Sequence, residues 1–198
     1  MTTKIINRED FLEKATELMK PLFKDKGYNI PLNLRVSCSF PSTRGLSAKQ
    51  KAIGECWDSS ASDENKYNVF ISPTIDDKWL VLSVLVHELV HATVGLKNGH
   101  NHIFKKCATA LGLEGKMTAT TFGETFKQLF KNVFNSLPKY DYKKINGSNR
   151  KKHSTRLLKV VCANGTGFVG RFSKGALNNF GFPKCPCCDE KMILENTE

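Results

Sequence analysis

The residues of this chain best suited to chemistry lie at positions 87–91, His87-Glu88-Leu89-Val90-His91. Positions four apart lie on the same face of a helix, so His87 and His91 can reach one metal ion. Glu88, one residue beyond His87, can reach a water molecule at that ion without being a ligand itself. Zinc hydrolases use this HExxH arrangement. The sequence therefore predicts a catalytic Zn²⁺ held by His87 and His91, with Glu88 as the catalytic base.

The neighbouring residues argue against the alternative, a buried helix that carries these side chains by chance. Of the twelve residues in 79–86 and 92–95, ten are apolar or glycine. Burying a carboxylate and two imidazoles in such a helix costs several kcal/mol unless partners are supplied, and a metal supplies them. A membrane span is excluded, because the apolar run before His87 has eight residues and a span needs about 20.

A catalytic zinc takes a third protein ligand, which we expect from the segment after the motif. Residues 99–113 predict a second helix, and its first turn carries His100 and His102. On such a helix these two positions are about 200° apart, so only one can face the metal. His100 shares a face with the apolar residues of the helix, among them Phe104. We therefore expect His100 to be the third ligand and His102 to lie at the surface or beside a ligand.

Two further amphipathic helices are expected, one on each side of the motif. Residues 8–24 have apolar residues at helical spacing, and Asn7 can cap this helix. Residues 122–137 carry an aromatic stripe at the same spacing, which closes the domain. Thr121 and Glu124 resemble a capping box for that last helix.

Three short strands are expected before the motif. The runs 32–38, 50–57 and 67–72 have the composition of strands, and we expect them to form a small antiparallel sheet. Asp76 or Asp77 can then cap the helix that carries the motif. Together these elements predict an α+β fold.

Composition indicates a globular protein of a reducing compartment. The chain has 198 residues, of which 40% are hydrophobic and 25% charged, enough for one domain with a small appendage. No signal peptide is visible at the N-terminus. Seven cysteines without an export signal indicate reduced thiols or metal ligands. We therefore expect a cytoplasmic protein without membrane contact, and its oligomeric state is not predicted.

The net charge of +11 is concentrated in one segment. Residues 1–138 contain 18 basic and 14 acidic residues, whereas residues 139–184 contain 11 basic residues and one acid, and residues 185–198 one basic residue and four acids. A local excess of this kind suits a polyanion, most simply nucleic acid. The alternative is a solvated basic tail that keeps the protein soluble.

Several stretches resemble the SprT-like metallopeptidases, a family that includes the Spartan proteases. The similarity is greatest to small phage and bacterial members and covers about residues 30–120. The stretches are Ile53-Gly-Glu-Cys-Trp57, Ile71-Ser-Pro73, the His87–His91 motif, Gly99-His100 with an aromatic four residues later, and residues 111–120.

This resemblance implies a zincin-like metallopeptidase core that acts near DNA, in a bacterial cell or a phage-infected host. The chain departs from the family at Asn101, where glycine is usual, and at Ile103, where an acidic residue is common. Met117 would lie beneath the zinc or in the core.

The resemblance also implies a C-terminal zinc ribbon with two Cys-x-x-Cys pairs. Cys185 and Cys188 form one pair, but Cys162 is followed at the third position by a glycine. A structural zinc takes four ligands, and these cysteines supply three. Cys187 or His153 are the candidates for the fourth. A second, structural zinc and a ribbon-shaped module without metal both remain open.

The chain is thus expected to comprise a metallopeptidase domain (1–138), a basic linker (139–156) and a basic zinc-ribbon-like module (157–198). Phenylalanines interleave with basic residues in the module, so it can bind phosphates and stack on bases. The residues expected to contact nucleic acid are Arg150, Lys151, Lys152, Arg156, Lys159, Arg171 and Lys174, with Phe168, Phe172 and Phe180 between them.

The function expected from these features is zinc-dependent hydrolysis of peptide bonds in DNA-associated or DNA-crosslinked proteins. One rival is a zinc-containing nucleic-acid-binding or regulatory protein that cleaves nothing. A second rival is a peptidase that needs no nucleic acid.

Overall fold

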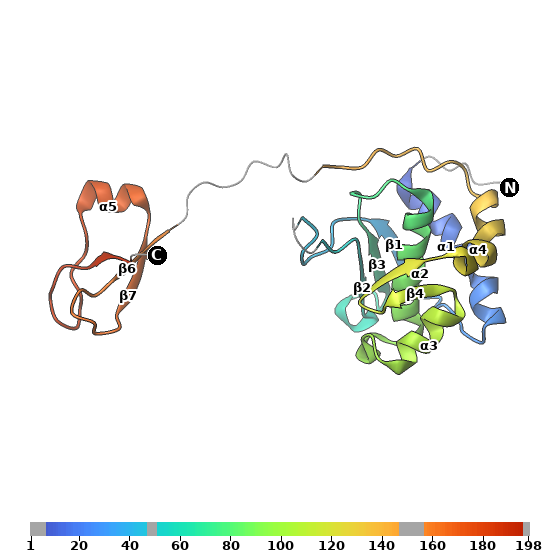
Figure 1. Cartoon of the computed structure of the whole chain (residues 1–198), viewed down its shortest axis with the longest axis horizontal. Helices are drawn as coiled ribbons and strands as arrows, with labels where there is room; N and C mark the ends of the chain where they lie inside the picture. Colours follow the sequence, from blue (N-terminus) through green and yellow to red (C-terminus); the bar gives the residue numbers. More distant parts are fainter. Residues whose placement is uncertain (1–6, 47–50, 147–156, 196–198) are drawn as a thin grey trace. The chain divides into compact units, whose positions relative to one another are not determined.

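The computed structural model describes residues 7–46, 51–146 and 157–195. They belong to two compact units, one within 1–149 and one within 150–198 (Figure 1). The described residues form five α-helices and three small sheets, so the predicted α+β class is confirmed. None of these helices combines the length and apolar character that crossing a bilayer requires.

The first sheet contains strands β1 (Leu34–Cys38), β2 (Gly54–Trp57) and β3 (Tyr67–Ile71) in the order β1-β3-β2. All three strands lie within the predicted runs. Strand β2 is antiparallel to β3, but β1 is parallel to β3. The predicted all-antiparallel sheet is therefore wrong, because β3 lies between two strands that run in opposite directions and can be antiparallel to only one of them.

One face of this sheet forms the core of the first unit. Val69 and Ile71 are fully buried, whereas the alternating residues Asn68 and Phe70 remain partly exposed, as expected for a sheet covered on one side. Helix α1 (Arg8–Asp25) packs against β1, and helix α2 (Lys78–Val94) packs against β2 and β3. Figure 1 shows α2 running through the middle of the unit.

Helix α2 begins after one of the two aspartates predicted to cap it, and it ends at a glycine. The Asp77 carboxylate accepts a hydrogen bond of 2.8 Å from the Leu80 amide, so the predicted cap is confirmed. Gly95 ends the helix with φ = +85°, a conformation that favours glycine. Leu82, Leu85 and other apolar side chains are fully buried around α2, and each such leucine contributes about 1.5–3 kcal/mol. A helix that is apolar on most sides must be central.

Helix α1 and helix α4 (Glu124–Ser136) lie close to their predicted ranges, but only α1 has its predicted cap. Asn7 caps α1 as expected, and its side chain accepts from the Asp10 amide at 2.8 Å. Helix α4 is capped by Gly123 without a side-chain hydrogen bond. Thr121 lies instead in a strand, paired with Glu114, so the predicted capping box is wrong.

A β-hairpin replaces the end of the helix expected over residues 99–113. Helix α3 spans only His102–Ala110. Strands β4 (Leu113–Lys116) and β5 (Ala119–Phe122) follow it and pair antiparallel through a two-residue turn. Met117, in that turn, packs against the core as a partly buried side chain.

Residues 140–145 belong to the first unit and not to a free linker. The Tyr140 ring is buried, and its centroid lies 4.8 Å from that of Phe11. The Arg8 guanidinium donates to the Lys143 carbonyl at 2.6 Å, and the Ile145 amide donates to the Pro73 carbonyl at 2.9 Å. The first unit therefore continues past the predicted boundary at residue 138.

The second unit is a small sheet with one short helix. Strands β6 (Leu158–Val161), β7 (Val169–Phe172) and β8 (Ile193–Leu194) form an antiparallel sheet in the order β7-β6-β8, and helix α5 (Lys174–Phe180) connects β7 to the loop before β8. Its buried side chains are Val160, Cys162, Leu177, Cys185 and Met192.

Candidate metal centre

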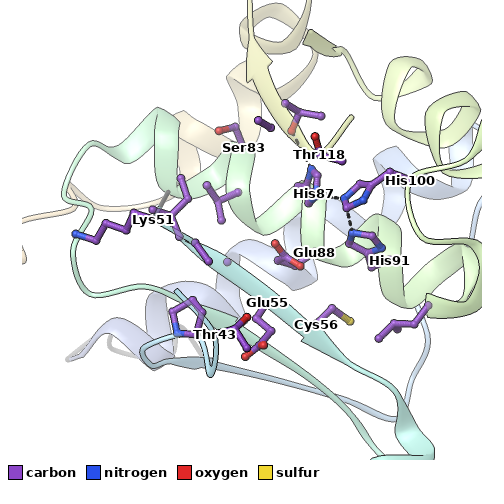
Figure 2. A pocket seen from close by; sticks show the side chains of 18 residues that line it. Thr43, Lys51, Glu55, Cys56, Ser83, His87, Glu88, His91, His100 and Thr118 are labelled. Carbon is purple, nitrogen blue, oxygen red and sulfur yellow. Dashed lines mark hydrogen bonds between the residues drawn. The ribbon is translucent and has the colours of Figure 1, made fainter. Parts of the chain in front are cut away.

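Three imidazole rings of the first unit converge on one point. His100 Nε2 lies 3.2 Å from His87 Nε2 and 3.1 Å from His91 Nε2. A tetrahedral ion with metal–nitrogen distances of about 2.05 Å separates its nitrogen ligands by about 3.3 Å. The ring nitrogens therefore have the spacing of a metal site, and the three histidines form a group that could hold a metal ion. Figure 2 shows them side by side at one end of a pocket.

The histidines come from two elements. His87 and His91 lie one turn apart on α2, as the spacing predicts. His100 precedes α3, which begins only at His102. His100 and His102 were expected on one helix, but only His102 lies on α3. Of these two, His100 is still the residue that joins the group. His102 is exposed and lies outside it.

A buried phenylalanine packs against all three rings. Phe104 is fully buried, and its ring centroid lies 5.0 Å from that of His87, 4.4 Å from that of His91 and 4.9 Å from that of His100. Because Phe104 and His100 flank the start of α3, the packing of this helix on α2 also sets the position of His100.

The environment keeps the imidazoles neutral. Burial, with His91 and His100 close by, lowers the pKa of His87 to about 3. Burial and the neighbouring His100 lower the pKa of His91 to about 4, and burial also lowers the pKa of His100. Near pH 7 all three rings therefore offer the neutral nitrogen that a metal requires.

Thr120 in the β4–β5 hairpin fixes the orientation of one ring. Its Oγ1 lies 2.8 Å from His87 Nδ1. When Nδ1 carries the proton and donates to this oxygen, Nε2 keeps the lone pair that faces the other histidines. This role of Thr120 was not predicted from the sequence. The β-branched threonines in the run Ala119-Thr120-Thr121 are the feature from which a strand here could have been predicted.

Glu88 lies next to the histidines but does not belong to their group. Its side chain is 6% exposed, and Figure 2 shows it between the three rings and the strand that carries Glu55 and Cys56. Burial, with a smaller effect of Glu55, raises the pKa of Glu88 to about 8. A dication held by the histidines would lower that pKa.

Gly54 makes room for the Glu88 carboxyl. A Cβ atom at position 54 would lie 2.4 Å from Glu88 Oε1 and 2.6 Å from Val84 Cγ1. Neither distance is possible for real atoms without movement. Glycine at this position of β2 therefore lets the glutamate side chain pass between α2 and the sheet.

The site opens into a pocket of about 490 Å³. Residues 52–56, which include most of β2, line one side of this pocket. Residues 118–120 of the hairpin line another side. His87, Glu88, His91 and His100 all line this pocket.

A second group that could hold a metal lies in the second unit. The sulfur atoms of Cys162, Cys185 and Cys188 lie within 4.8 Å of one another. Cys187 is exposed and is not in the group. The other candidate for a fourth ligand, His153, lies outside the described residues.

Only some of the residues expected to contact nucleic acid lie in the part of the chain that the structure describes. Lys159 forms an ion pair with Glu195, and Arg171 lies opposite Lys159 on the neighbouring strand. Lys174 opens α5. Phe168 and Phe180 are exposed, whereas Phe172 packs against the core of the unit. The remaining expected contacts, Arg150, Lys151, Lys152 and Arg156, lie outside the described residues.

No protein-family model, curated protein or solved structure matches this chain.

The convergence of three rings predicts that the first unit loses its metal when His100 is removed. We expect His100→Ala to lower the metal content of the purified protein by one equivalent, because two imidazoles remain. Elemental analysis measures this loss. His102→Ala is the matched control, since His102 is exposed and lies two residues away. Equal metal content in wild type and His100→Ala would contradict the site.

The contact between Thr120 and His87 predicts a second effect on affinity. Thr120→Val keeps the shape of the side chain but removes the oxygen that holds Nδ1, so we expect metal affinity to fall about 10–100-fold. Thr120→Ser should retain most of the affinity. Competition with a chelator of known affinity measures the difference, and equal affinity of the valine and serine variants would show that the contact has no such role.

Proposed function

We propose that the first unit is a zinc-dependent endopeptidase of SprT-like type, with a zincin-like core. His87, His91 and His100 hold the zinc and Glu88 is the catalytic base. The observation that carries the proposal is the convergence of three imidazole rings, with His100 Nε2 3.1 Å from His91 Nε2 and 3.2 Å from His87 Nε2, beside a buried carboxyl that lies outside the group.

The residues present suit zinc. Three neutral imidazoles are a common ligand set for this ion in catalytic sites, and three protein ligands leave a position for water or substrate. When bound, zinc acidifies water and polarises a carbonyl group.

Glu88 supplies the proton transfer. Its carboxylate takes a proton from the attacking water and then donates it to the nitrogen of the leaving amine. The opening at Gly54 keeps this carboxyl beside the histidines, and burial keeps it away from competing solvent.

The pocket supports an extended peptide as substrate. In the part of the chain that the structure describes, β2 is an edge strand of its sheet, and β3 is the strand with which it pairs. An extended peptide can pair with such an edge through backbone hydrogen bonds. A peptide along β2 would pass Gly54, whose neighbour across the gap is Glu88.

The substrates we propose are proteins associated with DNA or crosslinked to it. The charge of residues 139–184, 11 basic residues against one acid, supports binding of this segment to nucleic-acid phosphates. The exposed rings of Phe168 and Phe180 offer surfaces for stacking. Because Lys159 pairs with Glu195, Arg171 and Lys174 are the better candidates for phosphate contacts among the described residues.

The alternative function is a zinc-containing nucleic-acid-binding protein that cleaves nothing. In this alternative the histidine site and the basic segment have the same binding roles, but Glu88 transfers no proton.

Replacing the base separates the two functions. We expect Glu88→Gln to lower the cleavage rate of a DNA-linked protein by at least about 10²-fold, the usual contribution of a general base, while metal content and DNA binding stay at wild-type values. Gel analysis of cleavage and elemental analysis of the metal measure both effects. Equal cleavage by both proteins would exclude the peptidase.

Gly54→Ala tests the same carboxylate without changing it. The added methyl group must displace Glu88, so turnover should fall while the histidines keep their metal. Thermal melting shows whether the variant is folded, and Ala52→Gly, at a nearby position that also lines the pocket, serves as the matched control.

The basic segment predicts that DNA stimulates cleavage. We expect single- or double-stranded DNA to raise the rate, and deletion of residues 150–198 to remove this stimulation while basal cleavage remains. The deletion begins there because residues 140–145 pack on the first unit. Rates measured with and without DNA check this prediction. A full-length protein that ignores DNA would favour the peptidase that needs no nucleic acid.

A further inference from the structure

The segment between α2 and α3 determines whether His100 can reach the two histidines of α2. It contains the 3₁₀ turn η2 (Leu96–Asn98) and two glycines with positive φ, Gly95 at +85° and Gly99 at +47°. An added Cβ atom would meet nothing within 4 Å at either glycine, so packing at these positions does not confine the backbone. Glycine also has the widest choice of backbone conformations. The conformation that brings His100 to the group therefore needs other contacts.

Two asparagine side chains supply such contacts. Asn98 Nδ2 donates a hydrogen bond of 2.6 Å to the carbonyl of Val94, the last residue of α2. Asn101 Nδ2 donates to Asn98 Oδ1 at 3.3 Å. The amides of Ile103 and Phe104 donate to Asn101 Oδ1 at 2.9 Å and 3.4 Å. These two side chains, which we call the asparagine pair, thus join the end of α2 to the first turn of α3.

The backbone partners fix the orientation of both side-chain amides. A carbonyl oxygen only accepts, so the Asn98 group that faces Val94 must be its NH₂. A backbone N–H only donates, so the Asn101 atom that faces α3 must be its oxygen. This leaves Asn98 Oδ1 and the Asn101 NH₂ to face each other as acceptor and donor, and every link of the hydrogen-bond chain is complementary.

His100 lies inside the turn that the asparagine pair closes. The Asn101 amide donates to the Asn98 carbonyl at 3.0 Å, so the backbone also closes around this residue. One end of the hydrogen-bond chain is Val94, on the helix that carries His87 and His91. The other end is Phe104, whose ring packs against all three imidazoles. The asparagine pair therefore connects the elements that set the position of His100.

We propose that Asn98 and Asn101 are positioning residues of the metal centre, which hold His100 where it can share an ion with the histidines of α2. This inference rests on the proposed function, because it takes the histidine group to be a metal site. A ligand that is already in place loses less conformational freedom when the ion binds, and this raises affinity. The SprT-like pattern usually has glycine at position 101, and glycine has no side chain that could form these bonds.

Metal affinity of full-length variants tests the role of the asparagine pair. Serine caps a helix about as well as asparagine does, so Asn101→Ser keeps α3 but removes the amide that donates to Asn98. We expect Asn101→Ser and Asn98→Leu each to weaken zinc binding about tenfold, measured by chelator competition on the equivalent that His100→Ala loses. Thr109→Ala is the matched control, because its hydroxyl donates to the Lys105 carbonyl within α3, and it should bind as wild type does.

The spectrum of bound Co²⁺ separates positioning from stability. Spectra are read as differences from His100→Ala, in which two imidazoles remain. In Asn101→Ser we expect part of the absorption of the three-imidazole centre to be lost, although the melting temperature stays at the wild-type value. A loss of stability alone would lower the melting temperature and leave the spectrum of the bound ion unchanged.

The double variant tests whether the two side chains act as one unit. Asn98→Leu with Asn101→Ser should bind zinc no more weakly than the weaker single variant, because either change breaks the chain of hydrogen bonds. Wild-type affinity in both single variants, or losses that add in the double variant, would overturn the positioning role and leave the histidine centre standing. If Asn98→Leu does not fold, Asn101→Ser alone decides. A wild-type protein that holds no more zinc than His100→Ala would instead overturn the metal centre itself.

Discussion

Partial burial of the two histidine rings on α2 is the constraint on which the site of the first unit depends. Charged rings at 3.1–3.2 Å between nitrogens would repel one another, so the arrangement requires neutral histidines. Burial supplies this condition by lowering the pKa of His87 and His91, and Phe104 contributes by packing against every ring. The apolar surroundings of the motif are therefore part of its chemistry and not only of its stability.

The two candidate metal sites relate differently to their folds. Around the histidines, the core consists of apolar side chains, mainly leucine, valine and phenylalanine, and none of the three histidines belongs to it. In the second unit, Cys162 and Cys185 are themselves core residues. Removal of a metal should thus leave the first core largely intact, whereas the second core loses the contacts that join its loops.

Features that depend on neighbouring residues could be predicted from the sequence. The start of α2 follows from Asp77, one of the two predicted caps, because a cap acts within one turn. The pairing of His87 with His91 follows from helical periodicity. Features that depend on contacts between distant segments were predicted wrongly or not at all. These include the parallel pairing of β1 with β3, since the direction of a strand depends on how the whole sheet packs, and the contact of Thr120 with His87.

The sequence by itself determined the chemical groups of the candidate site: two histidines one turn apart, a glutamate beside them and a further histidine shortly afterwards. Only the tertiary structure decided how these groups meet. His100 reaches the others from the residues before α3, Thr120 holds His87 from a hairpin, and Gly54 makes room for the carboxyl from a separate strand. The physical reason is that helix periodicity is local, whereas a ligand's orientation and burial depend on side chains that folding brings from elsewhere in the chain.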